Sequence, residues 1–294
     1  MTQPARPSRQ PPGVHHKAVG DVIVTALNDG MFEGSFAMLA SFETLAAERL
    51  HQAAFRAIPP KLAVNSFLIQ TADRMILVDS GCGTNFGVGL GNLAGNLAAL
   101  GIKPGDIDTV LCTHLHPDHV GGLVDSAGKA VFPGAELVVH AADHAFWGDD
   151  ATLAHATTDQ DRGFIALARA TIAAYGDRTR LLTTGEALAG ITLVPEPGHT
   201  PGHSGWLIAS GNASLLIWGD IVHMPGVQFT RPDAGMAFDI DGAQAITTRQ
   251  RIMDMAASDR LLVAGMHLDF PCFGHVVRAS EGYAFIPDVW TPTV

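Results

Sequence analysis

The sequence predicts an α+β fold in which two β-sheets pack face to face between outer helices, a four-layer αββα sandwich. Short apolar and alternating runs typical of strands occur in two groups, separated by a helical middle section. The resulting order is strands, helices, strands and helices, which favours two stacked sheets with helices outside. The chain has 294 residues, of which 47% are hydrophobic and 16% charged, so it can bury a core of this size.

The first half of the chain opens with a polar, proline-rich segment. We expect residues 1–17 to form a flexible N-terminal arm, and residues 18–294 to form a single domain. The expected elements are a strand at 21–27, short helices and loops at 32–60, strands at 63–70 and 74–79, a glycine-rich loop at 81–91, a helix at 92–100 and a strand at 108–112. Gly101 provides the C-terminal cap that ends the helix.

The second half of the chain also contains segments typical of strands and helices. Its expected strands lie at 136–139, 191–195, 205–209, 214–218 and 261–264, and its expected helices at 141–147, 160–175 and 242–257. A buried strand therefore precedes each of the chain's main histidine clusters. Because chemistry is often carried by loops at strand ends, these clusters are the first candidates for function.

Charge and cysteine content exclude several classes of partner. The formal net charge of −11 disfavours nucleic acid and anionic membranes, and no apolar run reaches the roughly 20 residues of a membrane span. The three cysteines form no C-x-x-C pair, so a disulfide scaffold or a cysteine-rich zinc site is not expected. Their odd number favours reduced thiols and therefore a cytoplasmic location. The first 17 residues lack the apolar stretch of a signal peptide; had one been removed, the protein would be periplasmic or secreted.

The strongest functional signal is the segment Thr113–Gly122, which follows a buried strand and ends in a Gly-Gly turn. It places four possible metal ligands, His114, His116, Asp118 and His119, within six positions. Imidazoles mixed with one carboxylate suit Zn, Mn, Fe or Co rather than Ca or Mg. The alternative, a surface loop that is merely rich in histidine, leaves both the spacing and the position after a strand unexplained.

This segment resembles the H-x-H-x-D-H signature of the metallo-β-lactamase superfamily. The other positions of that pattern are also filled in order, by His199 in a P-G-H-T-P-G-H run, Asp220 after Trp218-Gly219, and His267 after Gly265-Met266. The resemblance implies two divalent metal ions, zinc first, with Mn, Fe or Co possible. It implies that one ion takes His114, His116 and His199, that the other takes Asp118, His119 and His267, and that Asp220 and a hydroxide bridge them.

Further residues are expected to support this chemistry. Asp79, in Leu77–Gly81, resembles a superfamily aspartate that orients a ligand histidine; a turn cap is the alternative. The bridging hydroxide would be the nucleophile, with Asp118 or Asp220 carrying a proton. His203 is expected to support a loop by hydrogen bonding rather than bind metal.

A finer resemblance is to methyl parathion hydrolase and its lactonase-like relatives. It is carried by segments 65–69, 77–81, 219–229 and 266–275, and it covers nearly the whole chain. It implies a substrate pocket with Phe86, Trp147 and Phe164, for which ordinary core packing is the alternative. His223 departs from this group, because acyl-homoserine lactonases place tyrosine there and organophosphate hydrolases an apolar residue. We expect His223 to contact substrate; a structural hydrogen bond is the alternative.

The expected function is hydrolysis of uncharged esters, by a lactonase or arylesterase with promiscuous organophosphate (phosphotriester) hydrolase activity. One alternative is a specialised organophosphorus hydrolase of the methyl parathion type, and another is a metal-binding or ligand-binding member of the fold without catalysis. The expected partner is a small-molecule ester or lactone. A homodimer is also expected, with the apolar segments between Phe32 and Phe55 as its interface.

Overall fold

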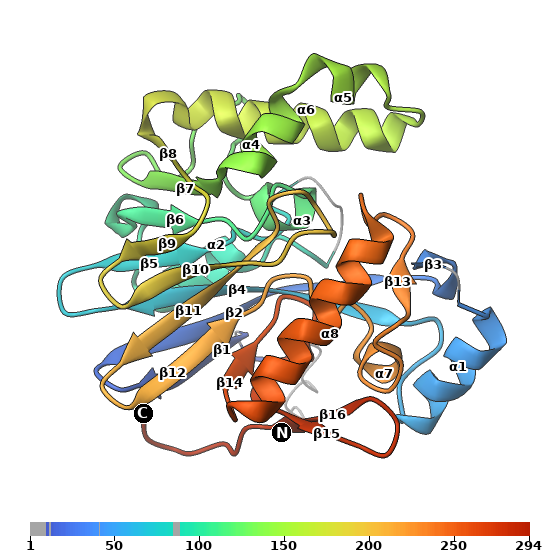
Figure 1. The fold of residues 1–294 in the computed structure, drawn as a ribbon. Helices are drawn as coiled ribbons and strands as arrows, with labels where there is room; N and C mark the ends of the chain where they lie inside the picture. Colours follow the sequence, from blue (N-terminus) through green and yellow to red (C-terminus); the bar gives the residue numbers. More distant parts are fainter. Residues whose placement is uncertain (1–9, 12, 41, 85–88) are drawn as a thin grey trace, which may run out of the picture.

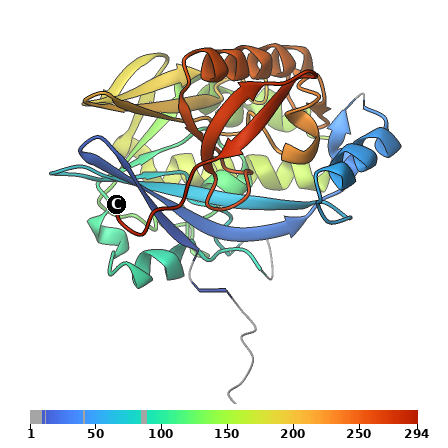
Figure 2. The same cartoon turned by 90° about the horizontal axis from the view of Figure 1, so that it is seen from below.

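A computed structural model describes residues 10–11, 13–40, 42–84 and 89–294 of the chain (Figure 1). Two large sheets pack face to face and carry helices on their outer sides, so the predicted αββα architecture is confirmed. Figure 2 shows the orange-red helix α8 (Gly242–Ser258) on the outer side of one sheet.

The first sheet has seven strands. β1, β2, β4 and β5 pair antiparallel, whereas β5, β6, β7 and β8 pair parallel. In order across the sheet they are β1 (Val14–Val19), β2 (Val22–Glu33), β4 (Lys61–Gln70), β5 (Met75–Val78), β6 (Thr109–Leu111), β7 (Glu136–His140) and β8 (Thr179–Leu182).

The second sheet also has seven strands, all antiparallel except for the central parallel pair β12 and β14. In order they are β16 (Tyr283–Pro287), β15 (Phe273–Arg278), β14 (Leu262–Ala264), β12 (Ala213–Ile217), β11 (Ser204–Ser210), β10 (Ile191–Pro195) and β9 (Gly185–Leu188). A separate two-stranded ribbon joins β3 (Leu39–Ala40) to β13 (Gly235–Met236).

The helices cover the outer faces and form the rim of the sandwich. Besides α8 they are α1 (Thr44–Ala53), α2 (Leu93–Ala99), α3 (Pro117–Val120), α4 (Ala141–Gly148), α5 (Asp150–Ala154), α6 (Asp159–Tyr175) and α7 (Pro225–Gln228), with 3-10 turns at Phe36–Met38, Pro104–Asp106 and Gly176–Arg178. In the described part of the chain, no helix combines the length and apolarity needed to cross a membrane.

The core follows from the two-residue period of the strands. In β4, Phe67 and Ile69 point into the cluster between the sheets, where they join Trp206 of β11. Leu68, between them, points to the outer cluster with Leu97 of α2. Side chains on both faces of β4 are buried, which explains why its sequence is a nearly continuous apolar run.

Parallel pairing aligns the strand ends that carry the predicted ligands. β5 and β6 run parallel, so the segments after Val78 and Leu111 leave the first sheet at the same edge. β12 and β14 run parallel as well, so the segments after Ile217 and Ala264 leave the second sheet at a common edge. Binding sites of open sheets commonly lie outside such carboxyl ends.

The predicted N-terminal arm was too long. Val14 to Lys17 belong to β1, which pairs with β2 from Val14↔Leu27 to Val19↔Val22, so the sheet begins before residue 18. The polar residues were misleading because β1 is an edge strand, which tolerates polar side chains. His16 Nδ1 lies 2.7 Å from Thr25 Oγ1, and Lys17 pairs with Asp288. Residues 1–9 and 12 lie outside the described residues.

Candidate metal centre

The seven predicted ligands converge from four separate segments. Four short loops and the one-turn helix α3 bring them to one edge of the sandwich, and all are buried except Asp118, which is partly exposed. His114 and His116 follow β6, Asp118 and His119 lie in α3, His199 follows β10, Asp220 follows β12, and His267 follows β14. The strand ends thus bring together residues up to 153 positions apart in sequence, from His114 to His267.

The conformation of the first ligand loop is fixed by Asp79, directly after β5. Its Oδ1 accepts a hydrogen bond from the Thr113 backbone N–H at 2.8 Å, and its Oδ2 accepts one from Thr113 Oγ1 at 2.6 Å. Asp79 has a φ of 55°, a left-handed conformation that non-glycine residues rarely adopt. Such backbone strain persists where surrounding bonds fix it, and here it turns the carboxylate toward the loop.

Glycine is required where this loop meets the segment after β5. A Cβ on Gly121 would lie 2.3 Å from the Cys82 carbonyl oxygen, and one on Gly122 would lie 2.3 Å from the Ser80 carbonyl oxygen. Both neighbours are backbone atoms that cannot move aside cheaply. The Gly-Gly turn therefore allows the ligand loop to pack directly on the adjacent segment.

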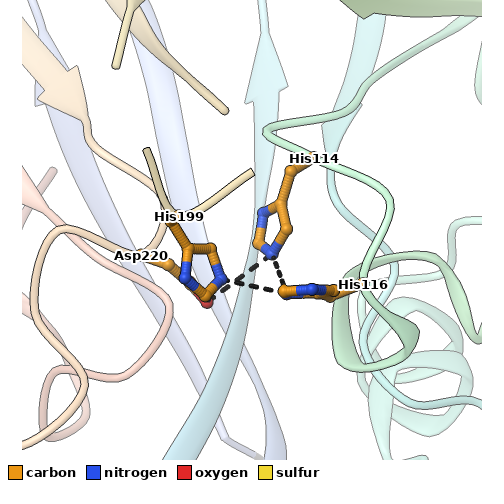
Figure 3. A group of neighbouring side chains, drawn as sticks. All are labelled: His114, His116, His199 and Asp220. Carbon is orange, nitrogen blue, oxygen red and sulfur yellow. Dashed lines mark hydrogen bonds and ion pairs between the residues drawn. The ribbon is translucent and has the colours of Figure 1, made fainter. Parts of the chain in front are cut away.

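The first ligand set consists of His114, His116, His199 and Asp220 (Figure 3). The nitrogen His116 Nδ1 lies 2.9 Å from both His114 Nε2 and His199 Nε2. Asp220 Oδ2 lies 3.3 Å from His199 Nε2 and 3.7 Å from His114 Nε2. Ligand atoms on a tetrahedral zinc ion with bonds of roughly 2.0–2.1 Å are about 3.3 Å apart, so these spacings suit one ion.

The second ligand set consists of Asp118, His119 and His267. Asp118 Oδ2 lies 3.5 Å from His267 Nε2 and 3.8 Å from His119 Nε2. Asp220 faces this set too, because its Oδ1 lies 3.2 Å from His119 Nε2 and its Oδ2 lies 3.3 Å from His267 Nε2. One carboxylate therefore stands between both groups, the position of a bridging ligand.

The chemistry of the buried atoms fits a cation. Among the described residues, His119 Nε2 and Asp220 Oδ1 are buried without a hydrogen-bond partner, although both point into the site. Burial lowers the pKa of His114 and of His116 well below the usual histidine value, so both rings are neutral and can offer a lone pair. A divalent ion would satisfy atoms that are otherwise costly to bury.

Hydrogen bonds to the ring nitrogens that face away from the site orient three of the ligand histidines. Asp79 Oδ2 lies 2.7 Å from His119 Nδ1, Asp239 Oδ1 lies 2.7 Å from His199 Nδ1, and the Ala63 carbonyl oxygen lies 2.7 Å from His267 Nδ1. Such partners fix the tautomer and direct the opposite nitrogen at the metal. Sequence reasoning did not identify Asp239 as such a partner, because it lies between α7 and α8 in a segment without a recognisable motif.

His203 supports Asp220 through its backbone. Its Nδ1 donates to the Glu196 carbonyl oxygen at 2.9 Å, and its Nε2 accepts from the Asp220 N–H at 2.9 Å. Burial lowers the pKa of His203 to about 3, so the ring is neutral and this acceptor role is available. The geometry agrees with the expectation that His203 supports a loop.

An apolar cavity of about 190 Å³ opens onto the two ligand sets. The predicted pocket residues Phe164 and His223 line it, and so do Phe238 and other apolar side chains that sequence reasoning missed. Those others are Phe32, Met38, Leu62 and Leu90. Trp147 lines an adjoining groove of about 540 Å³ instead, with its ring centroid 5.4 Å from that of His116. Phe86 lies outside the described residues.

His223 lies between the ligands and the cavity. Its ring stacks on His267 with centroids 5.0 Å apart and planes at 22°, and its Nε2 lies 3.0 Å from Asp220 Oδ2. Its backbone N–H donates to Gln228 Oε1 at 2.7 Å. Because Nδ1 has no hydrogen-bond partner in the described chain, the ring has a nitrogen available for a ligand.

The hydrogen bonds of Asp79 make a quantitative prediction. Asp79→Asn tolerates the left-handed backbone but places an amide against His119 Nδ1, so the zinc affinity should fall about 10- to 100-fold. Competition with a fluorescent chelator measures the dissociation constant. Asp125→Asn is the control, because Asp125 is exposed and caps only the N–H groups of Ala127 and Lys129. Equal zinc affinity in both variants would contradict the role of Asp79.

Comparisons with known proteins agree with the geometry. A family model described as the metallo-beta-lactamase superfamily matches residues 59–267, a span that contains all seven predicted ligands. The crystal structure of AbOPH, a hydrolase in the beta-lactamase superfamily, has a TM-score of 0.91 at 32% identity and covers 96% of this chain and 100% of that one.

Two lactonases are also similar. The structure of AidC, a dizinc quorum-quenching lactonase in complex with the product N-hexanoyl-L-homoserine, has a TM-score of 0.88 at 26% identity, covering 95% of this chain and 99% of that one. The N-acyl homoserine lactonase AiiB of Agrobacterium fabrum is 37% identical over 87 residues, which cover 24% of this chain and 31% of AiiB. The chain described here belongs to the metallo-β-lactamase superfamily and is a metallohydrolase.

Proposed function

We propose that this protein is a dinuclear hydrolase of uncharged esters, a lactonase or arylesterase that also hydrolyses phosphotriesters. The observation that carries the proposal is the position of Asp220. Its carboxylate lies between the two ligand sets, with Oδ2 3.3 Å from both His199 Nε2 and His267 Nε2 and Oδ1 3.2 Å from His119 Nε2, and the apolar cavity opens beside it. Two ions bridged by one carboxylate can act together on a single ester bond. We propose zinc for both, because four-coordinate sites of imidazole and carboxylate suit it.

The bound ions would activate a water molecule as the nucleophile and polarise the carbonyl or phosphoryl oxygen of the substrate. Asp220 fixes the spacing between the two ligand sets. Asp118 is the one ligand side chain that is partly exposed, and it lines the cavity, so its carboxylate can carry a proton to the leaving oxygen. His223 Nδ1 or Nε2 can donate a hydrogen bond to the same substrate oxygen.

The cavity walls define the class of substrate. Phe32, Leu62, Phe164 and Phe238 make them largely apolar, and in the described chain no lysine or arginine lines the cavity. Away from the proposed metal ions, an anionic group on the substrate would find no basic side chain in these walls, so an uncharged ester is favoured. AidC and AiiB are lactonases, which supports a lactone as the main substrate and a phosphotriester as the secondary one.

The size of the cavity favours a substrate with a small head and an apolar arm. Its volume of about 190 Å³ suits a lactone ring or a small ester group. Pockets for larger ligands commonly measure roughly 300–1,000 Å³. The adjoining groove of about 540 Å³ shares His116, Gln160, Phe164 and Phe238 with the cavity, so it gives an acyl or aryl arm room to extend.

A parallel assay of three uncharged substrates tests the proposal. Zinc-loaded protein is given dihydrocoumarin, N-decanoyl homoserine lactone and methyl paraoxon. We expect a lactone to reach a kcat/KM above about 10⁴ M⁻¹s⁻¹ and to exceed the phosphotriester. A clear preference for the phosphotriester would identify a specialised organophosphorus hydrolase instead, and turnover of none would reject the substrate class.

Two variants make this assay specific for the site. Asp220→Ala removes the bridging carboxylate and should lower kcat/KM by at least about 100-fold for every substrate. His223→Phe keeps the ring volume but removes the donor, and should lower kcat about 10- to 100-fold with a smaller change in KM. An unchanged kcat in His223→Phe would reduce His223 to a packing residue.

We also propose that the protein forms a homodimer through α1 and the turn after it. Phe55 is 100% exposed and has a φ of 57°, and Leu45 and Ile58 are exposed at 60% and 42%. Contiguous exposed apolar patches commonly mark protein contacts, and we propose that these side chains contribute to one. The buried thiols of Cys112 and Cys272 fit a reducing compartment, and we propose the cytoplasm.

Light scattering during size-exclusion chromatography tests the dimer. The unmodified protein should have twice the mass of one chain, whereas Phe55→Asp combined with Leu45→Asp should yield the monomer with lactone hydrolysis retained. Trp290→Asp is the control, because Trp290 is 69% exposed and lies far along the chain. A monomer before any substitution, or a dimer in the double variant, would reject this interface.

A further inference from the structure

A buried polar pair lies behind the metal centre and takes no part in the chemistry proposed above. Arg249 of α8 is 2% exposed, and Gln228, the last residue of α7, is fully buried. In the described chain, Arg249 has no carboxylate within ion-pair distance. Burying a guanidinium that makes no direct ion pair is costly, so its hydrogen bonds must offset that cost.

Those hydrogen bonds all end on backbone carbonyls of two loops. Arg249 Nε donates to the Ile221 carbonyl oxygen at 2.7 Å, and Nη1 donates to the carbonyl oxygens of Pro232 and Ala234 at 3.1 and 3.0 Å. Gln228 Nε2 donates to the same Ala234 oxygen at 2.9 Å. The two side chains therefore converge on one carbonyl.

Gln228 also holds the other loop. Its Oε1 accepts hydrogen bonds from the backbone N–H groups of His223 and Met224, at 2.7 and 3.0 Å. One planar amide thus connects residues 219–224, the bridging loop, to residues 232–239, the wall loop. All of its polar atoms are used in this connection, as a buried amide requires.

Each of the two loops carries residues that the metal centre needs. The bridging loop holds Asp220 and His223, and the wall loop holds Phe238 of the cavity and Asp239, whose Oδ1 lies 2.7 Å from His199 Nδ1. The spacing between Asp220 and His199 therefore depends on how the two loops are held together. Helix α8 braces the segment before His199 as well, since Thr248 Oγ1 donates to the Pro197 carbonyl oxygen at 2.7 Å.

We propose that Gln228 and Arg249 are positioning residues that clamp the bridging loop to the wall loop and so set the geometry of the metal centre. They touch neither the ligand atoms nor the cavity. The inference rests on the proposed metal centre but not on the identity of the substrate. Partners behind metal ligands typically change metal affinity or activity about 10- to 100-fold, which sets the expected size of the effect.

The experiment compares Gln228→Met, Arg249→Met and the double variant with Arg178→Met. Arg178 is a matched control, because it also donates to three backbone carbonyls, those of Phe132, Ala135 and Ala174, none of them in either loop. Zinc dissociation constants are measured by chelator competition. Backbone hydrogen exchange of residues 219–228 is measured on the metal-free protein, so that one readout is independent of metal and of turnover.

We expect each of the two methionine variants of the clamp to weaken zinc binding about 10- to 100-fold, and the double variant to weaken it by less than the product of the two effects. The amides of His223 and Met224 should exchange at least about fivefold faster in Gln228→Met, since they lose their acceptor. Arg178→Met should leave zinc affinity within about twofold of the unmodified protein.

The opposite pattern overturns the inference. If both clamp variants lower the melting temperature as Arg178→Met does, yet bind zinc normally and keep their slow exchange, the pair is only structural. If Arg249→Met fails to fold, Arg249→Lys replaces it. Lysine keeps the buried positive charge but lacks the planar guanidinium that donates hydrogen bonds to both loops. Arg249→Lys must therefore still weaken zinc binding. An unmodified protein that binds no zinc would overturn the metal centre itself, which separates the two failures.

Discussion

Seven histidine and aspartate side chains point their ring nitrogens and carboxylate oxygens into one site. The rest of the structure depends on this convergence. Imidazole nitrogens 2.9 Å apart and a carboxylate oxygen with no donor are costly to bury in protein alone. Divalent cations would convert the same arrangement into coordination bonds. The fold can hold it because two parallel strand pairs, β5–β6 and β12–β14, end at edges that meet at this site.

The supporting structure is arranged in layers around that convergence. Asp79 and Asp239 hold ligand rings from behind, and His203 holds the backbone of Asp220. Behind these, α8 reaches the loops of both His199 and Asp220 through Thr248 and Arg249. Gly198 allows this close approach, because a Cβ there would lie 2.2 Å from the Ala245 nitrogen. Packing of the outer helix and ligand geometry are therefore linked.

Local sequence patterns predicted the sandwich and the residues that converge in the candidate site, since H-x-H-x-D-H, Asp220 and His267 each follow a recognisable apolar strand. The pattern did not predict β1, whose edge position tolerates polar residues, nor β15 and β16, where Gly274, His275 and Pro287 interrupt the alternation. Asp239, Gln228 and Arg249 act only through tertiary contacts, so no local spacing marks them. Cavity residues such as Phe32 and Phe238 come from separate loops, which sequence periodicity cannot place.

The central claim is that Asp220 bridges two ions, and anomalous diffraction from crystals of the zinc-loaded protein tests it most directly. We expect two zinc peaks per chain about 3.5–4 Å apart. One peak should lie among His114, His116 and His199 and the other among Asp118, His119 and His267, with an Asp220 oxygen near each. A single peak, or two peaks with Asp220 turned away from either, would contradict the dinuclear centre and the hydrolytic chemistry derived from it.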